Sequence, residues 1–269
     1  MANQALPAAE NASEYSVMTY ATYIGSPAKG DTAAEGSRPQ SYMMDDIAAL
    51  QAMYGANFSA SGPTRYSWDP NTGETFVNGV GQGRPGAAGD AAADRNKVFL
   101  TIWNGDGKDA TYDFSAYRNA VQINLRPGQY SVASPAQLAV LGPDAHARGK
   151  VYNARRYGND PRSLIGGAVG GAGDDTITGN AADNTLKGGP GSNAIDGGGG
   201  ANTAVYDMAR GQAAITLASA GRLGVSFAGG RTASRTSRNS GSATRRWPPR
   251  ACPGSPTPTR PRERPACSR

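Results

Sequence analysis

The fold is decided by residues 170–205, which read GGAGDDTIT (170–178), GNAADNTLK (179–187), GGPGSNAID (188–196) and GGGGANTAV (197–205). Glycine occupies position one of all four nonapeptides. Position six carries a side-chain oxygen, in Asp175, Asn184, Asn193 and Asn202, and position eight is apolar, in Ile177, Leu186, Ile195 and Ala204. A flexible glycine-rich linker has no reason to keep this register, so the spacing predicts a structural repeat.

The nine-residue period predicts a parallel β-roll. Glycines at the start of each unit permit left-handed turns. The last three residues of each unit form a short strand, and the position-eight side chain enters the core. Two units complete one turn of the coil. We therefore expect Ile177 to stack on Ile195 in one sheet, and Leu186 to stack on Ala204 in the other.

The turns of such a roll favour calcium, a hard cation that takes six to eight oxygen ligands. Turns eighteen residues apart can supply the carbonyls of positions two and four and the side chain of position six. The ligands expected in the repeats are Gly171, Gly173, Asp175, Asn180, Ala182, Asn184, Gly189, Gly191, Asn193, Gly198, Gly200 and Asn202.

The two predicted sites differ in ligand charge. One site pairs Asp175 with Asn193 and carries a single negative charge, whereas the other pairs Asn184 with Asn202 and carries none. Because fewer charged ligands weaken calcium binding, the first site should fill at lower calcium. Without calcium we expect the roll to be largely unfolded, since binding supplies the folding free energy.

Upstream of the repeats, an amphipathic helix is predicted. Apolar residues recur at helical spacing at Met43, Ile47, Leu50 and Tyr54. Ser41 can cap its start and Gly55 can close its end. Further β-strands are predicted at residues 98–103, 111–114, 121–125, 213–217 and 224–227. No run of apolar residues reaches the length of a membrane span.

Residues 231–269 differ in kind from the rest. They hold ten Arg, one Glu, seven Pro and both Cys residues, so their net charge is +9 against +6 for the whole chain, which leaves −3 for the remainder. With little to bury, this tail is predicted to be disordered. Its abrupt onset after Gly230 suggests a frameshift. Ten arginines could contact phosphates, but only Trp247 is available for base stacking, so we do not expect a nucleic-acid partner.

Several segments resemble the serralysin family of secreted bacterial zinc metalloproteases, which are metzincins. The nonapeptides match the family's RTX repeats. MMDDIAALQAMYGAN (43–57) is similar to the family's helix and its exit, and SVMTY (16–20) resembles its Met-turn. WNGDGKDATYDFS (103–115) resembles a family calcium loop, and residues 122–125 the strand that follows. The resemblance covers residues 13–228.

The resemblance would place Met18 beneath a catalytic zinc and Tyr20 beside it. Metzincins need HExxHxxGxxH to hold that zinc and supply a general base, and this chain has one histidine, His146. We therefore expect no complete zinc site and no catalysis by this chain, which would begin downstream of the active site. Met18 and Tyr20 are expected to take part in ordinary packing, and zinc only in an intact homologous protease.

The same resemblance implies calcium ligands outside the repeats, namely Gly62, Thr64, Asn104, Asp106, Gly107 and Asp109. A plain hairpin turn is the equally weighted alternative for this loop. Gly166 stands where the family has an acidic ligand, so this position should contribute no charge.

These observations predict a mainly β chain with three parts. Residues 1–55 would be a remnant of a metalloprotease catalytic domain that includes the one helix. Residues 56–230 would form a calcium-binding domain with the β-roll and β-strand flanks, and residues 231–269 the tail. The function expected is calcium binding in a secreted, type I-exported serralysin-like protease, with the C-terminal export signal lost and the catalytic domain or a protein substrate as partner. The alternative is a non-catalytic RTX module of an adhesin or surface-layer protein.

Overall fold

The structure is a computed structural model of the chain. It describes residues 6–26, 31–59, 62–85, 96–105, 107–207, 213–217, 222–227 and 230–235. Its helices are α1 (Met44–Tyr54) and the 3-10 turns η2 (Gly107–Asp109), η3 (Pro135–Gln137) and η4 (Pro161–Ser163). The strands before the repeats are β1 (Thr64–Trp68), β2 (Thr75–Val77), β3 (Val80–Gly81), β4 (Leu100–Ile102), β5 (Ala110–Asp113), β6 (Gln122–Asn124), β7 (Tyr130–Ser131), β8 (Val140–Gly142), β9 (Ala145–His146) and β10 (Val151–Asn153). The strands of the repeats and beyond are β11 (Gly167–Val169), β12 (Thr176–Thr178), β13 (Thr185–Lys187), β14 (Asn193–Asp196), β15 (Thr203–Val205), β16 (Ala213–Leu217), β17 (Arg222–Phe227) and β18 (Gly230–Arg235).

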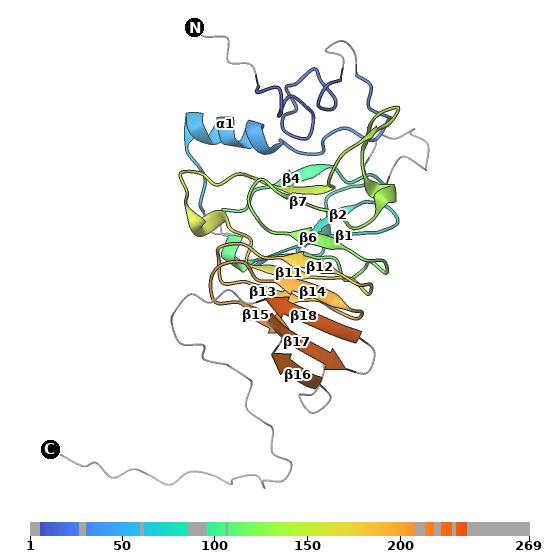
Figure 1. Ribbon diagram of the computed structural model, residues 1–269. Helices are drawn as coiled ribbons and strands as arrows, with labels where there is room; N and C mark the ends of the chain where they lie inside the picture. Colours follow the sequence, from blue (N-terminus) through green and yellow to red (C-terminus); the bar gives the residue numbers. More distant parts are fainter. Residues whose placement is uncertain are drawn as a thin grey trace, which may run out of the picture. The chain divides into compact units, whose positions relative to one another are not determined.

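The repeats form the expected roll of two parallel ladders. In one sheet Ile177 pairs in register with Ile195, and in the other Leu186 pairs with Ala204. Figure 1 shows β11 to β15 stacked in chain order, with α1 at the opposite end of the stack from β15. Ala204 is exposed, because β15 is the last strand of its sheet and nothing among the described residues covers it.

Both ladders continue upstream of the repeats. β12 pairs in parallel with β6, which places Ile123 beside Ile177, and β11 pairs in parallel with β5, which places Ala168 beside Tyr112. β5 and β6 therefore form an earlier coil of the same roll. The chain leaves the roll after β6, builds β7 to β10, and returns at β11. The repeats therefore share both of their sheets with this upstream coil.

The core of the roll lies between the two sheets and includes a buried lysine. Lys150 is fully buried, and its Nζ atom donates hydrogen bonds to Tyr117 Oη and, at 2.9 Å, to Gln137 Oε1. The same Nζ atom lies 4.3 Å from the Tyr117 ring centroid. Burial holds the pKa of the Lys150 ammonium well below its ordinary value.

The predicted helix forms, but Ser41 does not cap it. The Oγ atom of Ser41 instead accepts a hydrogen bond from Thr101 N at 2.8 Å. The helix begins later because Asp46 accepts from Met43 N at 2.9 Å, which satisfies an amide at the helix start. Gly55 closes the helix with φ of 80° and donates its N–H to Gln51 O.

β18 (Gly230–Arg235) runs across the domain boundary predicted at residue 231. Residues 231–235 belong to β18, which pairs in parallel with β14 and antiparallel with β17. β18 occupies the place beside β14 that a further coil of the roll would take. Residues 236–269, the rest of the expected tail, lie outside the described residues. Among the described residues, no helix has the length and apolarity to cross a membrane.

Candidate calcium sites

Four stacked turns join the strands of the roll, two on each side. We name them by their position-six residue: the Asp175 turn (170–175) stacks on the Asn193 turn (188–193), and the Asn184 turn (179–184) stacks on the Asn202 turn (197–202). In the register of the ladders, each turn lies eighteen residues from its stacked partner. The sequence prediction of two turn pairs is therefore confirmed at the level of the backbone.

The Asp175 turn contains a buried carboxylate that lacks a full set of partners. Asp175 is 1% exposed; its Oδ1 atom accepts from Val121 N at 2.8 Å, but its Oδ2 atom is buried without a hydrogen bond. Burial raises the pKa of the Asp175 carboxyl to about 6, while the nearby amides of Val121 and Gly171 oppose that shift. A buried anion with an unsatisfied oxygen is costly, and a bound cation would remove that cost.

Carbonyl oxygens also lie close to the contact between the two stacked turns. A Cβ atom on Gly189 would overlap Gly171 O, and one on Gly191 would overlap Gly173 O, so both carbonyls point toward the lower turn. The two lower glycines have φ of 83° and 91°, which side chains disfavour. A Cβ atom on Gly170 would overlap both Asp175 Oδ2 and Gly188 O. Carboxylate and carbonyl oxygens therefore gather here, as calcium requires.

The second pair of turns has similar carbonyls but no unsatisfied side-chain oxygen among its described contacts. Asn180 O and Ala182 O point toward Gly198 and Gly200 in the same way. However, Asn184 Oδ1 already accepts from Asn180 N at 2.8 Å. The Nδ2 atom of Asn184 donates to Ile165 O at 2.9 Å. This pair is closed by its own hydrogen bonds.

The side-chain amide nitrogens of Asn193 and Asn202 both donate hydrogen bonds to carbonyls of their own turns. Asn193 Nδ2 donates to Gly189 O at 3.0 Å and lies 3.5 Å from Gly191 O. Asn202 Nδ2 donates to Gly199 O at 2.7 Å and lies 3.5 Å from Gly200 O. Three carbonyls expected to bind calcium, those of Gly189, Gly191 and Gly200, therefore lie within reach of a side chain of their own turn.

Two acidic residues at position five escaped the sequence prediction. Asp174 Oδ1 accepts from Ser192 N at 2.6 Å, and Asp183 Oδ1 accepts from Ala201 N at 2.6 Å. Each carboxylate therefore joins its own turn to the turn below it. The signal was available, because position five is acidic only in the first two units. Asp183 also places a negative charge beside the turn pair that we counted as neutral.

The candidate ligands outside the repeats gather at one end of β1 and β5. Thr64 pairs in register with Ala110, which follows directly after η2. This pairing brings Gly62 and Thr64 near the strand end that carries Gly107 and Asp109, although Asp106 lies outside the described residues. Thr64 Oγ1 donates to Gly62 O at 3.2 Å.

Two further residues border this loop. Asn104 is buried and its Nδ2 atom donates to Tyr66 Oη at 3.1 Å. A Cβ atom on Gly166 would overlap the carbonyl of Lys108. An acidic side chain at residue 166 is therefore sterically excluded by the η2 backbone, and this chain cannot supply that ligand without a shift of η2.

The segment around Met18 is anchored but not packed. Asp46 Oδ2 accepts from Val17 N at 2.8 Å, and Asp46 Oδ1 accepts from Ser16 Oγ at 2.6 Å. Met18 and Tyr20 nevertheless expose 80% and 85% of their surface. The prediction of ordinary packing is wrong for both side chains, because the segment leaves most of their surface exposed to solvent.

The single histidine is a surface residue. His146 is exposed at the end of the short hairpin strand β9. Across the described residues, no three His, Cys, Asp or Glu side chains gather into a metal-binding group. The candidate calcium sites of the roll are therefore made largely from carbonyl and amide oxygens.

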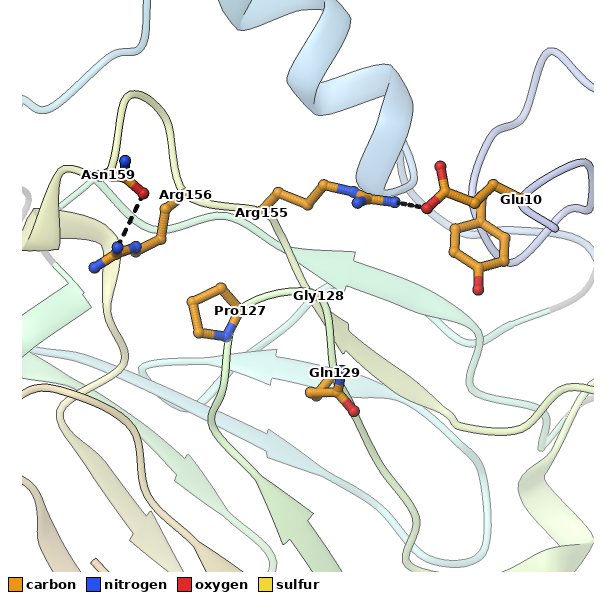
Figure 2. Close-up of a pocket in the computed structure, with 8 residues that line it drawn as sticks. Glu10, Pro127, Gly128, Gln129, Arg155, Arg156 and Asn159 are labelled. Atoms are coloured by element: carbon orange, nitrogen blue, oxygen red, sulfur yellow. Dashed lines mark hydrogen bonds and ion pairs between the residues drawn. The ribbon is translucent and has the colours of Figure 1, made fainter. Parts of the chain in front are cut away.

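A cavity beside the end of β10 is lined by one carboxylate, Glu10, and two guanidinium groups, those of Arg155 and Arg156. Figure 2 shows Arg155 extended toward Glu10 and Arg156 turned toward Asn159. The Arg155 guanidinium lies 2.6 Å from Glu10 and 3.1 Å from Asp45. These ion pairs tie the N-terminal segment and α1 to the segment that follows β10.

Comparison with known families agrees with this geometry. Residues 169–204 match four copies of the RTX calcium-binding nonapeptide repeat, and residues 69–137 match the peptidase M10 serralysin C terminal. Residues 69–137 and 169–204 are thus similar to the C-terminal region of serralysins. Metallopeptidase AprA of Pseudomonas marginalis is 33% identical over 169 residues, or 61% of this chain and 28% of that protein. Serralysin B of Dickeya chrysanthemi is 32% identical over 126 residues, or 46% of this chain and 22% of that protein. The chain thus spans less than a third of the serralysins that it matches.

The matches confirm three predictions made from the sequence. The chain carries a calcium-binding RTX roll, its fold is mainly β, and calcium is its cofactor. Its relationship to serralysin-like proteases is also confirmed.

Proposed function

We propose that this chain is the calcium-binding scaffold of a secreted, serralysin-like zinc endopeptidase and does not itself cut protein. The carrying observation is the Oδ2 atom of Asp175, which is buried without a hydrogen bond and lies next to Gly170, as does the carbonyl oxygen of Gly188 in the stacked turn. The ligands we assign there are Asp175, Gly171, Gly173 and Gly188. A calcium ion at this point would neutralise the buried carboxylate and join the repeats to the coil before them.

The proposal that the chain is not catalytic rests on its composition. One histidine cannot build the three-histidine zinc site of a metzincin. The relatives' names describe metallopeptidases, and peptidase activity in a longer protein that contains this region follows from that likeness alone. Secretion is supported in the same way. Loss of the export signal stays a prediction, because residues 236–269 lie outside the described part of the chain.

The exposed Met18 and Tyr20 favour a protease context over a stand-alone adhesin module. Both lie on a segment held by hydrogen bonds to Asp46 in α1. A free-standing module has no need to hold a large apolar side chain and a phenol in water on a braced segment. We propose that this surface contacts the zinc-bearing portion of a longer or associated chain.

Isothermal titration with calcium tests the scaffold, and casein hydrolysis tests the lack of catalysis. We expect wild-type protein to bind calcium and Asp175→Ala to lose one bound ion with its far-UV spectrum intact in calcium. Asn71→Asp, on an exposed loop away from the roll, serves as a control for a surface change. Unchanged stoichiometry in Asp175→Ala would contradict the assigned site. Casein cleavage that stops on zinc removal would contradict the non-catalytic assignment.

A further inference from the structure

In all four turns of the roll the tip of the position-six side chain lies beside the position-one glycine, and in the Asn184 turn this tip is the Oδ1 atom, next to Gly179. The other three turns differ in the atom that they place there. A Cβ atom on the position-one glycine would overlap that tip in each: Asp175 Oδ2 above Gly170, Asn193 Nδ2 beside Gly188, and Asn202 Nδ2 beside Gly197. The geometry is shared, but the chemistry is opposite. In the Asp175 turn the tip is a hydrogen-bond acceptor, whereas in the other two it is a donor.

The donor assignment of Asn193 is required by its surroundings. Its Oδ1 atom accepts from Asp175 N at 2.9 Å, and an amide N–H can only donate. Its Nδ2 atom lies 3.0 Å from Gly189 O and 3.2 Å from Pro190 O, and carbonyls can only accept. Exchanging the oxygen and nitrogen of this amide would turn all of these contacts into repulsions.

Asn202 repeats the arrangement in the other turn pair. Its Oδ1 atom accepts from Asn184 N, eighteen residues earlier, at 2.9 Å, and its Nδ2 atom donates to Gly199 O at 2.7 Å. The partial positive charge of each amide NH2 therefore lies among carbonyls that converge at the start of the turn. This is where an aspartate at position six would leave only acceptors and require a cation.

We propose that the amides of Asn193 and Asn202 replace a calcium ion in their own turns, so that the distal end of the roll closes without metal. The inference rests on the proposed calcium function, which it confines to the Asp175 turn. It also reverses our expectation that the roll unfolds without calcium. Asp174 and Asp183 reinforce the same closure, since each accepts a backbone amide from the turn below.

Asn193→Asp and Asn202→Asp test the proposal, alone and together, in the full chain. Each substitution exchanges the donor for a carboxylate that faces carbonyls. In EGTA the turn amides should then exchange roughly tenfold to hundredfold faster, because buried polar groups lose their partners. Added calcium should restore protection, and dialysis with radioactive calcium should show additional bound ions. Asn71→Asp adds the same charge on an exposed loop and should change neither measurement.

Hydrogen exchange of the wild-type protein in EGTA keeps the proposal falsifiable if the variants fail to fold. The amides of Ala194 and Thr203 donate across the stacked turns at 2.8 Å each. We expect both to stay protected in EGTA to within about threefold of their protection in calcium. Loss of that protection in EGTA would overturn the inference. So would a double variant that binds no additional calcium and shows the same amide exchange as the wild type. Failure of the wild type to bind calcium while both amides stay protected would instead refute only the proposed calcium site.

Discussion

Calcium binding at the Asp175 turn should depend strongly on pH between 5 and 7. Burial raises the pKa of this carboxyl from 3.8 to about 6. A proton and a calcium ion compete for the same oxygens, so affinity follows the ionised fraction. With a pKa of about 6, roughly 9% of the carboxyl is ionised at pH 5 and roughly 91% at pH 7. The apparent affinity should therefore rise about tenfold over that interval.

A rise in pH has opposite effects on the stability of the calcium-free and the calcium-bound protein. In the calcium-free protein the raised pKa means that protonated Asp175 is preferred in the fold. Stability present at low pH is then lost as the pH rises from about 4 through about 6. The calcium-bound protein gains stability over the same interval. Calcium should consequently raise the melting temperature more at pH 7 than at pH 5.

Isothermal titration at pH 5, 6 and 7, in buffers that do not bind calcium, measures the affinity directly. An aspartate with an ordinary pKa of 3.8 would change its ionised fraction by only about 1.1-fold between pH 5 and pH 7. The variant Asp175→Asn should lose the steep dependence, because an amide does not titrate. An affinity that changes less than twofold in the wild type would refute the burial argument, as would a tenfold change that survives in Asp175→Asn.

Three further substitutions test the fold that supports the site. Ile177→Ala should lower the free energy of unfolding in urea titrations by about 3 kcal/mol, because it leaves a cavity between the sheets. Ala204→Gly, at an exposed sheet edge, should lower it by less than about 1 kcal/mol. Equal losses in the two variants would contradict the pairing of the strands. Gly166→Ala should destabilise by about 1–3 kcal/mol through overlap with the Lys108 carbonyl, and a neutral result would mean that η2 can move. The free energy of unfolding should rise as the pH rises toward the unfolded lysine pKa of about 10.4, because the pKa of Lys150 is depressed in the fold. Lys150→Met should abolish that rise. An unchanged dependence on pH in the variant would show that another group causes it.

The nine-residue period was sufficient to predict the register of the roll. It placed Ile177 against Ile195 because a parallel coil repeats its strands at a fixed interval. The period could not reveal that β5 and β6 form an earlier coil of the same roll. Between Tyr112 and Ile123 the spacing is eleven residues instead of nine, and no glycine motif marks the turn. Pairing to β11 and β12 becomes visible only when the excursion through β7 to β10 is folded.

The site was predictable in its backbone but not in its side-chain chemistry. Treating asparagine as a weaker aspartate is sound when only its oxygen is counted. In the folded turn, the Oδ1 atom of Asn193 accepts from the amide of Asp175, and its Nδ2 atom donates to Gly189 O. The predicted helix cap was wrong for a similar reason, because Ser41 and Asp46 could each accept from an amide at the helix start. In the structure Ser41 accepts from Thr101 N, and Asp46 accepts from Met43 N.

The position of Asp175 in the roll gives its calcium site a role that the more distal turns cannot have. Its Oδ1 atom accepts from Val121 N in the coil before the repeats, and Ala172 N in the same turn donates to Tyr117 O at 2.9 Å. The next turn down is closed by its own asparagine and does not depend on metal for its hydrogen bonds. A cation at Asp175 would therefore act at the boundary where the nonapeptides meet the β5–β6 coil, which lacks the repeat sequence. Position six is aspartate at this boundary and asparagine in the three units beyond it. Under the proposal, this pattern confines the calcium requirement to the contact between the repeats and the β5–β6 coil.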